Sequence, residues 1–135
     1  MQILLIIAVA VHVVAGVFWA GSTFTLARAD GVGAERLVRP QMGAATVTVL
    51  AGLVLWGIAH RGGFHRVEEV LGLGALCAIA AAGVQGMVVL PATRRLQGAS
   101  PADATGMRGR IAGGERAAAG LLMITVICMA ISRYV

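Results

Sequence analysis

A chain of 135 residues with 59% hydrophobic and only 13% charged residues differs from soluble domains, in which about 25% of residues are charged. Its net charge of +5 rests on 11 basic residues, all of them arginine. Most of these arginines lie in short loops beside apolar stretches, where they set membrane orientation and contact lipid headgroups, so we expect no nucleic-acid binding. The length leaves no room for a nucleotide-binding module.

Four long apolar stretches occupy most of the chain, with the charges gathered between them. A bilayer core about 30 Å thick is crossed by about 20 apolar helical residues. We therefore predict an all-α integral membrane protein, a single domain of residues 1–135 built as a four-helix bundle with up-down-up-down order. The lipid bilayer is its expected surrounding. The expected helices are residues 2–27, 40–60, 68–92 and 111–134.

The first stretch, residues 1–27, contains no charged residue. A signal peptide would open with positive charge and have an apolar core of about 7–15 residues, so we expect a retained helix. His12 is the one ionisable residue deep within it, roughly 15 Å below the surface at about 1.5 Å per residue. Because such a residue is costly in a membrane, two interpretations are open: a metal or haem ligand, or a core histidine bonded to a backbone carbonyl.

The boundaries of the later helices are predicted from their prolines and polar residues. Pro40 is expected at the start of the second helix, where its missing N–H costs nothing, and Pro91 near the end of the third. The longest expected loop is 94–110, in which Ser100 or Asp103 could cap a short helical turn. Glu115 and Arg116 follow at the entry to the fourth helix; Glu115 could pair with Arg116 or with Arg39.

Small residues recur every four positions within the first three helices. Such stripes let helix backbones approach closely in lipid, so they predict tight packing within the bundle or contact with a second copy or a larger membrane complex. They would also leave room for a flat ligand. The polar Gln85 and several threonines are expected to bond across helices. The stripes are Ala8-His12-Gly16-Ala20, Ala44-Thr48-Gly52 and Ala78-Ala82-Gly86.

Three residues expected at a similar depth in the membrane form a second candidate set of metal ligands. His12, Cys77 and Met123 lie at similar distances from the outer face, and nitrogen, thiolate and thioether groups together suit Cu(I). His60 and His65 of the outer loop are another candidate metal pair, although two loop histidines are most often solvated. The sequence contains no catalytic triad, zinc-protease motif or pair of buried carboxylates, so any chemistry would require a bound cofactor.

The arginines also predict orientation. Seven lie in the loops 28–39 and 94–110, against three in the other loop and at the C-terminus. Arginine is enriched on the cytoplasmic side, so we expect these two loops inside and both termini outside. A composition rich in alanine, glycine and arginine and free of lysine is typical of GC-rich bacterial genomes, and we therefore expect the bacterial inner membrane.

One segment of the first helix carries a family resemblance. His12-Val-Val-Ala-Gly-Val-Phe-Trp19-Ala-Gly21 combines a histidine, a tryptophan seven residues later and then small residues. It resembles the first helix of the CopD-like superfamily, which includes the membrane domain of bacterial copper-resistance proteins and the HemJ-type protoporphyrinogen oxidases. Two weaker similarities extend along the chain. Arg39-Pro40 followed by Gly52-Leu-Val-Leu-Trp56 is similar to the second helix of these proteins, and Gly114-Glu115 is similar to the start of their last helix.

The resemblance implies that His12 is an axial ligand to the iron of haem b, with Trp19 as its neighbour. The HemJ-type enzymes place a lysine on their third helix and this chain has none, which argues against porphyrinogen oxidation. We expect a small membrane haem b protein with an electron-transfer or haem-linked redox role, in which Gly16 and Ala20 flank the cofactor. Copper handling, and a non-catalytic subunit or assembly factor of a membrane complex, are the alternatives.

Overall fold

The computed structural model describes residues 2–59 and 65–135, and all the regular elements in these ranges are helical. Four long, apolar helical columns contain nearly all of the described residues. This confirms the expected helical bundle. The third column is formed by three consecutive elements. The elements are α1 (Gln2–Arg28), α2 (Ala34–Ala59), α3 (Arg66–Val84), the π-helical turn η1 (Gln85–Val89), α4 (Leu90–Leu96), α5 (Pro101–Ile131) and the 3₁₀ turn η2 (Ser132–Tyr134).

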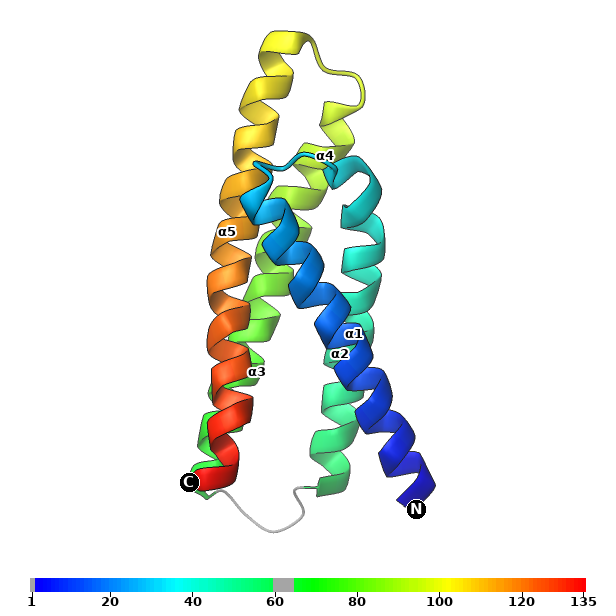
Figure 1. Ribbon diagram of the computed structural model, residues 1–135, viewed down its shortest axis with the longest axis vertical. Coiled ribbons are helices and arrows are strands. Elements are labelled where there is room, and N and C mark those ends of the chain that lie inside the picture. Colours follow the sequence, from blue (N-terminus) through cyan, green and yellow to red (C-terminus); the bar gives the residue numbers. More distant parts are fainter. Residues whose placement is uncertain (1, 60–64) are drawn as a thin grey trace.

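The helices pack mainly as two pairs. α1 lies against α2, and α3 lies against α5, while α1 also contacts α5 and so joins the pairs. Both termini lie at one end of the molecule, and the α1–α2 turn and the α4–α5 connection lie toward the other (Figure 1). The two pairs diverge toward the end that carries the termini (Figure 1).

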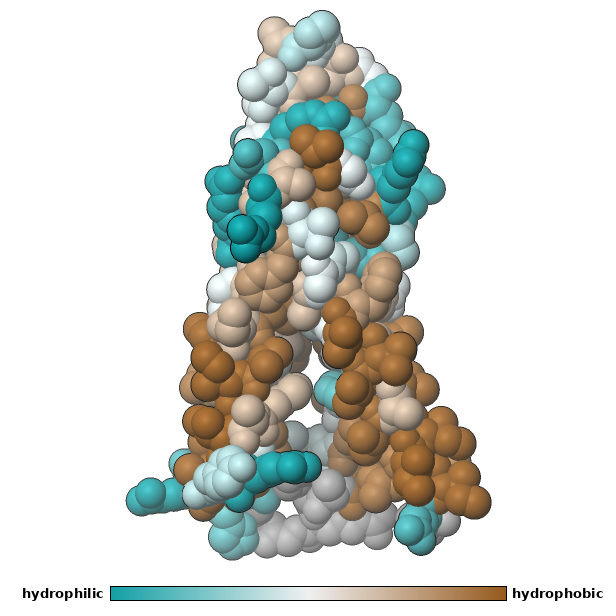
Figure 2. Space-filling model, viewed as in Figure 1, coloured by the Kyte–Doolittle hydropathy of each residue, from teal (hydrophilic) through white to brown (hydrophobic). Residues whose placement is uncertain are grey.

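The outer surface of the bundle is apolar over the half that carries the termini (Figure 2). On α1 the side chains of Ile3, Val14 and Val17 are 73%, 71% and 68% exposed. A water-soluble monomer rarely exposes so large a continuous apolar surface. All four columns are also long and apolar enough to cross a membrane. Length, composition and exposed surface together indicate a multi-pass membrane protein.

The second helix begins earlier than predicted. It starts at Ala34 rather than at residue 40, so Pro40 lies inside the helix and not at its start. The cause is a tight turn directly after α1, in which Gly31 and Gly33 have φ angles of 76° and 90°, a backbone conformation that glycine adopts without strain. Because the chain reverses within these few residues, α2 can start at once. The expected end at residue 60 lies outside the described residues.

The expected loop over 94–110 is mostly helical, which is a second correction. α4 continues to Leu96 and α5 begins at Pro101. The hydroxyl oxygen of Ser100 accepts the backbone N–H of Asp103 at 3.3 Å, and Pro101 follows directly, a combination that favours a helix start. The predicted cap at Ser100 is confirmed, but it opens the whole of α5 rather than a short turn.

The third column contains a π-helical turn in front of Pro91. The backbone N–H of Leu90 donates to the carbonyl oxygen of Gln85, five residues earlier. Pro91 has no N–H to donate, and its ring crowds the carbonyl one turn before it. A wider turn at this point relieves that crowding. The helix therefore continues past the expected end at residue 92 and reaches Leu96.

Gly114 of α5 allows that helix to approach η1. A Cβ atom at this position would lie 2.7 Å from Cγ2 of Val89, and the Val89 side chain is fully buried. Contacts this short do not occur between real side chains, and a buried valine has little freedom to move away. The close packing of α5 against η1 thus depends on glycine at residue 114.

We predict that Gly114→Ala lowers the free energy of unfolding by about 1–3 kcal/mol, the usual cost of overpacking a filled core. Gly106→Ala is the matched control, because Gly106 is exposed in the same helix and its added Cβ would meet nothing within 4 Å. Thermal unfolding in detergent, followed by circular dichroism, measures both. Equal midpoints for the two variants would contradict the packing described here.

Candidate functional site

His12 faces α2 with a half-buried ring. Its Nδ1 lies 2.9 Å from the backbone carbonyl oxygen of Thr48. Because a carbonyl oxygen only accepts, Nδ1 carries the hydrogen and Nε2 keeps the lone pair. A Cβ atom added at Gly52 would lie 3.0 Å from Cε1 of the imidazole. One added at Gly16 would lie 3.6 Å from the Thr48 side chain. The small-residue stripes of α1 and α2 thus face each other, which confirms the predicted tight packing.

The other two residues expected to flank a haem have separate surroundings. Ala20 is half-buried and packs against the apolar core that surrounds Trp19. Trp19 itself is only 1% exposed, and its indole N–H donates to Oε1 of Gln85 at 2.7 Å. The predicted role of Gln85 in bonding across helices is therefore confirmed.

The candidate copper ligands lie on different helices. Cys77 is half-buried on α3, whereas the Met123 side chain on α5 is 48% exposed. His65 caps α3, and its backbone N–H donates to Oε2 of Glu68 at 2.8 Å; His60 lies outside the described residues. In residues 2–59 and 65–135, no three His, Cys, Asp or Glu side chains group as metal ligands. Copper binding stays a prediction that depth alone supports.

The most deeply buried polar side chains form one cluster where the helical columns meet. Its members are Trp19 and Thr23 of α1, Gln41 of α2, Gln85 of η1 and Glu115 of α5, each at most 1% exposed. The carboxyl Oε2 of Glu115 accepts the side-chain amides of Gln41 at 3.1 Å and Gln85 at 2.8 Å. The hydroxyl oxygen of Thr23 accepts the same two amides at 2.8 and 2.9 Å.

Each polar hydrogen expected on these side chains has an acceptor. The Thr23 hydroxyl donates to the backbone carbonyl of Trp19 at 2.8 Å, and the indole of Trp19 donates to Gln85. Each glutamine amide makes two bonds, which uses both of its hydrogens. Two acceptors remain, since Oε1 of Gln41 and Oε1 of Glu115 are buried without a partner. The cluster therefore has more acceptor atoms than hydrogens.

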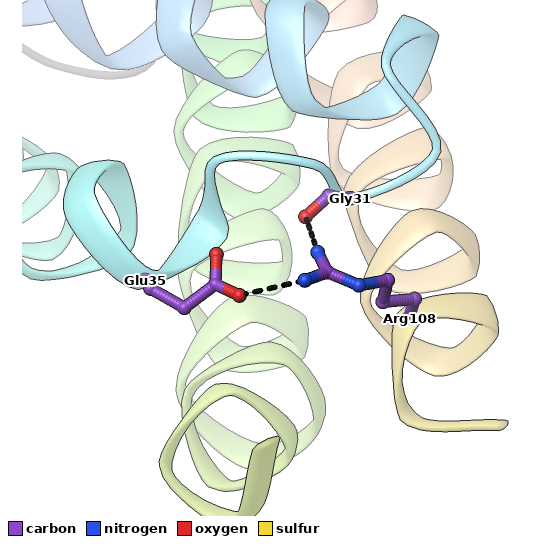
Figure 3. A network of polar contacts seen from close by, with 3 residues as sticks. All are labelled: Gly31, Glu35 and Arg108. Carbon is purple, nitrogen blue, oxygen red and sulfur yellow. Dashed lines mark hydrogen bonds and ion pairs between the residues drawn. The ribbon is translucent and has the colours of Figure 1, made fainter. Parts of the chain in front are cut away.

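Charged residues around the α1–α2 turn form a separate network. One Arg108 nitrogen, Nη2, donates to Oε1 of Glu35 at 2.9 Å, and Nη1 donates to the carbonyl oxygen of Gly31 at 3.4 Å (Figure 3). The guanidinium group thereby ties α5 both to the turn and to the start of α2. This is the end of the molecule in which the helical pairs lie closest together (Figure 1).

Glu115 has neither of its predicted partners. Arg116 instead donates to the carboxylate of Asp30 in the α1–α2 turn. The correction follows from helix geometry: consecutive residues point about 100° apart, so the buried Glu115 faces the bundle while the side chain of Arg116, 60% exposed, faces outwards. Proximity in the sequence is thus a poor guide to pairing here.

Gln41 is the functional candidate that sequence reasoning does not single out. Placing the helix start at Pro40 assigns Gln41 to a membrane interface, where a polar side chain needs no explanation. The usable signal is that Gln41, Gln85 and Glu115 each lie within an apolar helix, toward the end that carries the arginines. Three polar residues at one level of three helices predict a shared cluster.

In comparisons of the whole chain with known proteins, no protein-family model, no curated protein and no solved structure matches. The resemblance of the first helix to the CopD-like superfamily therefore stays a prediction.

We predict that Thr23→Val lowers the free energy of unfolding by about 1–3 kcal/mol, because the buried amides of both glutamines each lose an acceptor. Thr25→Val is the matched control, since the Thr25 hydroxyl is exposed and bonds only to the carbonyl of Gly21 in its own helix. The control should stay within about 0.5 kcal/mol of the unmodified protein. Denaturation in detergent measures both, and a neutral Thr23→Val would rule out a stabilising role for this hydroxyl.

Proposed function

We propose that this protein is a multi-pass protein of the bacterial inner membrane that binds haem b through Nε2 of His12 and serves in electron transfer or haem-linked redox chemistry. The observation that carries the proposal is the state of the His12 ring: Nδ1 donates to the carbonyl oxygen of Thr48, the bond also expected of a core histidine, while Nε2 has no hydrogen-bond partner among the described residues. The arginine-rich end, with the α1–α2 turn and the α4–α5 connection, faces the cytoplasm in this proposal.

The hydrogen bond supports ligation because it selects the tautomer. Histidines that bind metals usually donate their other ring N–H to a carbonyl or carboxylate, which fixes the ring and makes the ligating nitrogen more basic. For His12 this partner is Thr48, on the neighbouring helix. Nε2 is then the atom that offers a lone pair, and the half-buried ring remains accessible from outside the bundle.

The surroundings of the ring also suit a flat ligand. Gly16 and Gly52 keep side-chain bulk away from the imidazole and from Thr48. A haem held by His12 would supply one-electron redox chemistry, which the protein side chains alone do not offer. The chain would provide a single histidine ligand.

We predict that the purified protein, expressed with ample haem, shows a Soret absorption band that His12→Ala removes and His65→Ala retains. Gly52→Val should weaken haem binding by about 10–100-fold, because it displaces the ring from its carbonyl partner. Gly57→Val is the matched control, since an added Cβ there meets nothing within 4 Å. A colourless protein, or a band unchanged in His12→Ala, would overturn the proposal.

A second candidate, a non-catalytic subunit of a membrane assembly, is favoured by the outer face of α5. Gly109, Gly113 and Ala117 are four residues apart, Gly120 follows one turn later, and all are exposed. An added Cβ at any of these glycines would meet nothing within 4 Å. In lipid, such a stripe permits close contact with another helix, and the bundle itself leaves this one uncovered.

We predict for this second candidate that the protein in mild detergent cross-links as a homodimer or with a partner subunit, and that Gly113→Leu lowers the cross-linked fraction by more than half. The bulky side chain would separate the helix backbones that the glycines allow to approach. Gly57→Leu, at an exposed glycine of α2, serves as the control. A monomeric protein with no co-purifying partner would exclude this candidate.

A further inference from the structure

The buried cluster has two unmet acceptors that the haem proposal does not involve. They are Oε1 of Gln41 and Oε1 of Glu115, on side chains that are 0% exposed. The two groups already face each other, because the amide nitrogen of Gln41 donates to the second carboxyl oxygen of Glu115 at 3.1 Å. Buried acceptors without a donor are destabilising, and native structures contain few of them. A donor is missing at this position.

The residues around Glu115 do not supply that donor. Its partners from α2 and η1 are the neutral Gln41 and Gln85, and α1 adds only Trp19 and Thr23 to the cluster, which are also neutral.

The nearby arginines either pair with other carboxylates or lie exposed on the surface. Arg116 pairs with Asp30, and Arg108 pairs with Glu35. Arg39 of α2 and Arg94 of α4 line a small pocket on the surface, beside Glu35. Among the described residues no charged side chain bonds to Glu115, so its carboxyl group has no positive partner.

We propose that Glu115 and Gln41 form a proton-binding site at the junction of the four helical columns, in which Oε1 of Glu115 carries a proton and donates it to Oε1 of Gln41. A hydronium ion of the surrounding water gives up the proton: one of its O–H bonds breaks, an O–H bond forms at Oε1 of Glu115, and a water molecule is left. One added hydrogen then satisfies both unmet oxygens. Together with the amide of Gln41, it would give a paired acid–amide contact.

A proton fits this site better than a metal cation or a water molecule. Divalent cations take six or more oxygen ligands, and the cluster has only two oxygens to spare. A water molecule could donate to both oxygens, but it would leave a negative charge unpaired within the bundle, which is strongly unfavourable. The proton removes the charge and supplies the missing donor at once.

The site predicts a direction for the pH dependence of stability. The folded protein holds this proton between Oε1 of Glu115 and Oε1 of Gln41, an arrangement that unfolding breaks. When the folded state binds more protons, the free energy of unfolding falls as the pH rises. Loss of the proton would remove the hydrogen bond between Oε1 of Glu115 and Oε1 of Gln41, and with it one of the two bonds between these side chains.

Infrared spectroscopy of the protein in a detergent without ester groups tests the proposal, and it needs no bound haem. The C=O stretch of a protonated carboxyl should be present in the unmodified protein, shift in D₂O and disappear in Glu115→Gln. Glu35→Gln is the matched control, because Glu35 is partly exposed and paired with Arg108, and the band should persist there. A missing band, or one that survives in Glu115→Gln, overturns the proposal.

Thermal unfolding gives a second, independent readout. Glu115→Gln should fold, because its amide can donate to Gln41 in place of the acid. The midpoint of the unmodified protein should fall by several degrees as the pH rises, and that of Glu115→Gln should fall less, because only the other titratable groups, such as Asp30 and Glu35 in their ion pairs, remain. A midpoint of the unmodified protein that is insensitive to pH but rises with added sodium or potassium chloride would indicate a bound cation instead and would refute the proton site.

Discussion

The carboxyl group of Glu115 accepts hydrogen bonds from glutamines on two other helical columns, and the arrangement of the bundle depends on this contact. Within a membrane, polar groups must find their partners inside the protein. Gln41 and Gln85 bond both to Glu115 and to Thr23, so all four columns are fixed to one level. Apolar contacts can slide along a helix, whereas hydrogen bonds of defined length fix how far each helix is inserted relative to the others.

Two local features of the backbone make this contact possible. Gly114 brings α5 close to Val89, directly beside the residue that supplies the carboxyl group. The π-helical turn begins at Gln85, and in front of Pro91 it changes the direction in which the following side chains point. A regular helix with a larger residue at position 114 would hold α5 farther from η1. The polar cluster therefore depends on Pro91 and Gly114 as well as on its own side chains.

The four apolar columns follow from the sequence because length and composition alone decide whether a helix can cross a membrane. Helix ends were harder to predict, since they depend on turn geometry: the glycines at 31 and 33 let α2 start before Pro40, and Ser100 starts α5 early. The sequence indicates less about the candidate sites. The depth of His12 follows from counting residues, but the direction in which each side chain points around its helix does not, and so the meeting of Gln41 with Glu115 stayed hidden.

The salt bridges of α5 are distributed unevenly along the molecule. Arg108 and Arg116 both reach the turn region between α1 and α2, so the two helical pairs are clamped together at the arginine-rich end. Toward the termini the pairs diverge (Figure 1). α2 and α3 follow one another in the chain, so the backbone also links the two pairs at this end, and the short stretch between Ala59 and Arg66 limits how far they can separate.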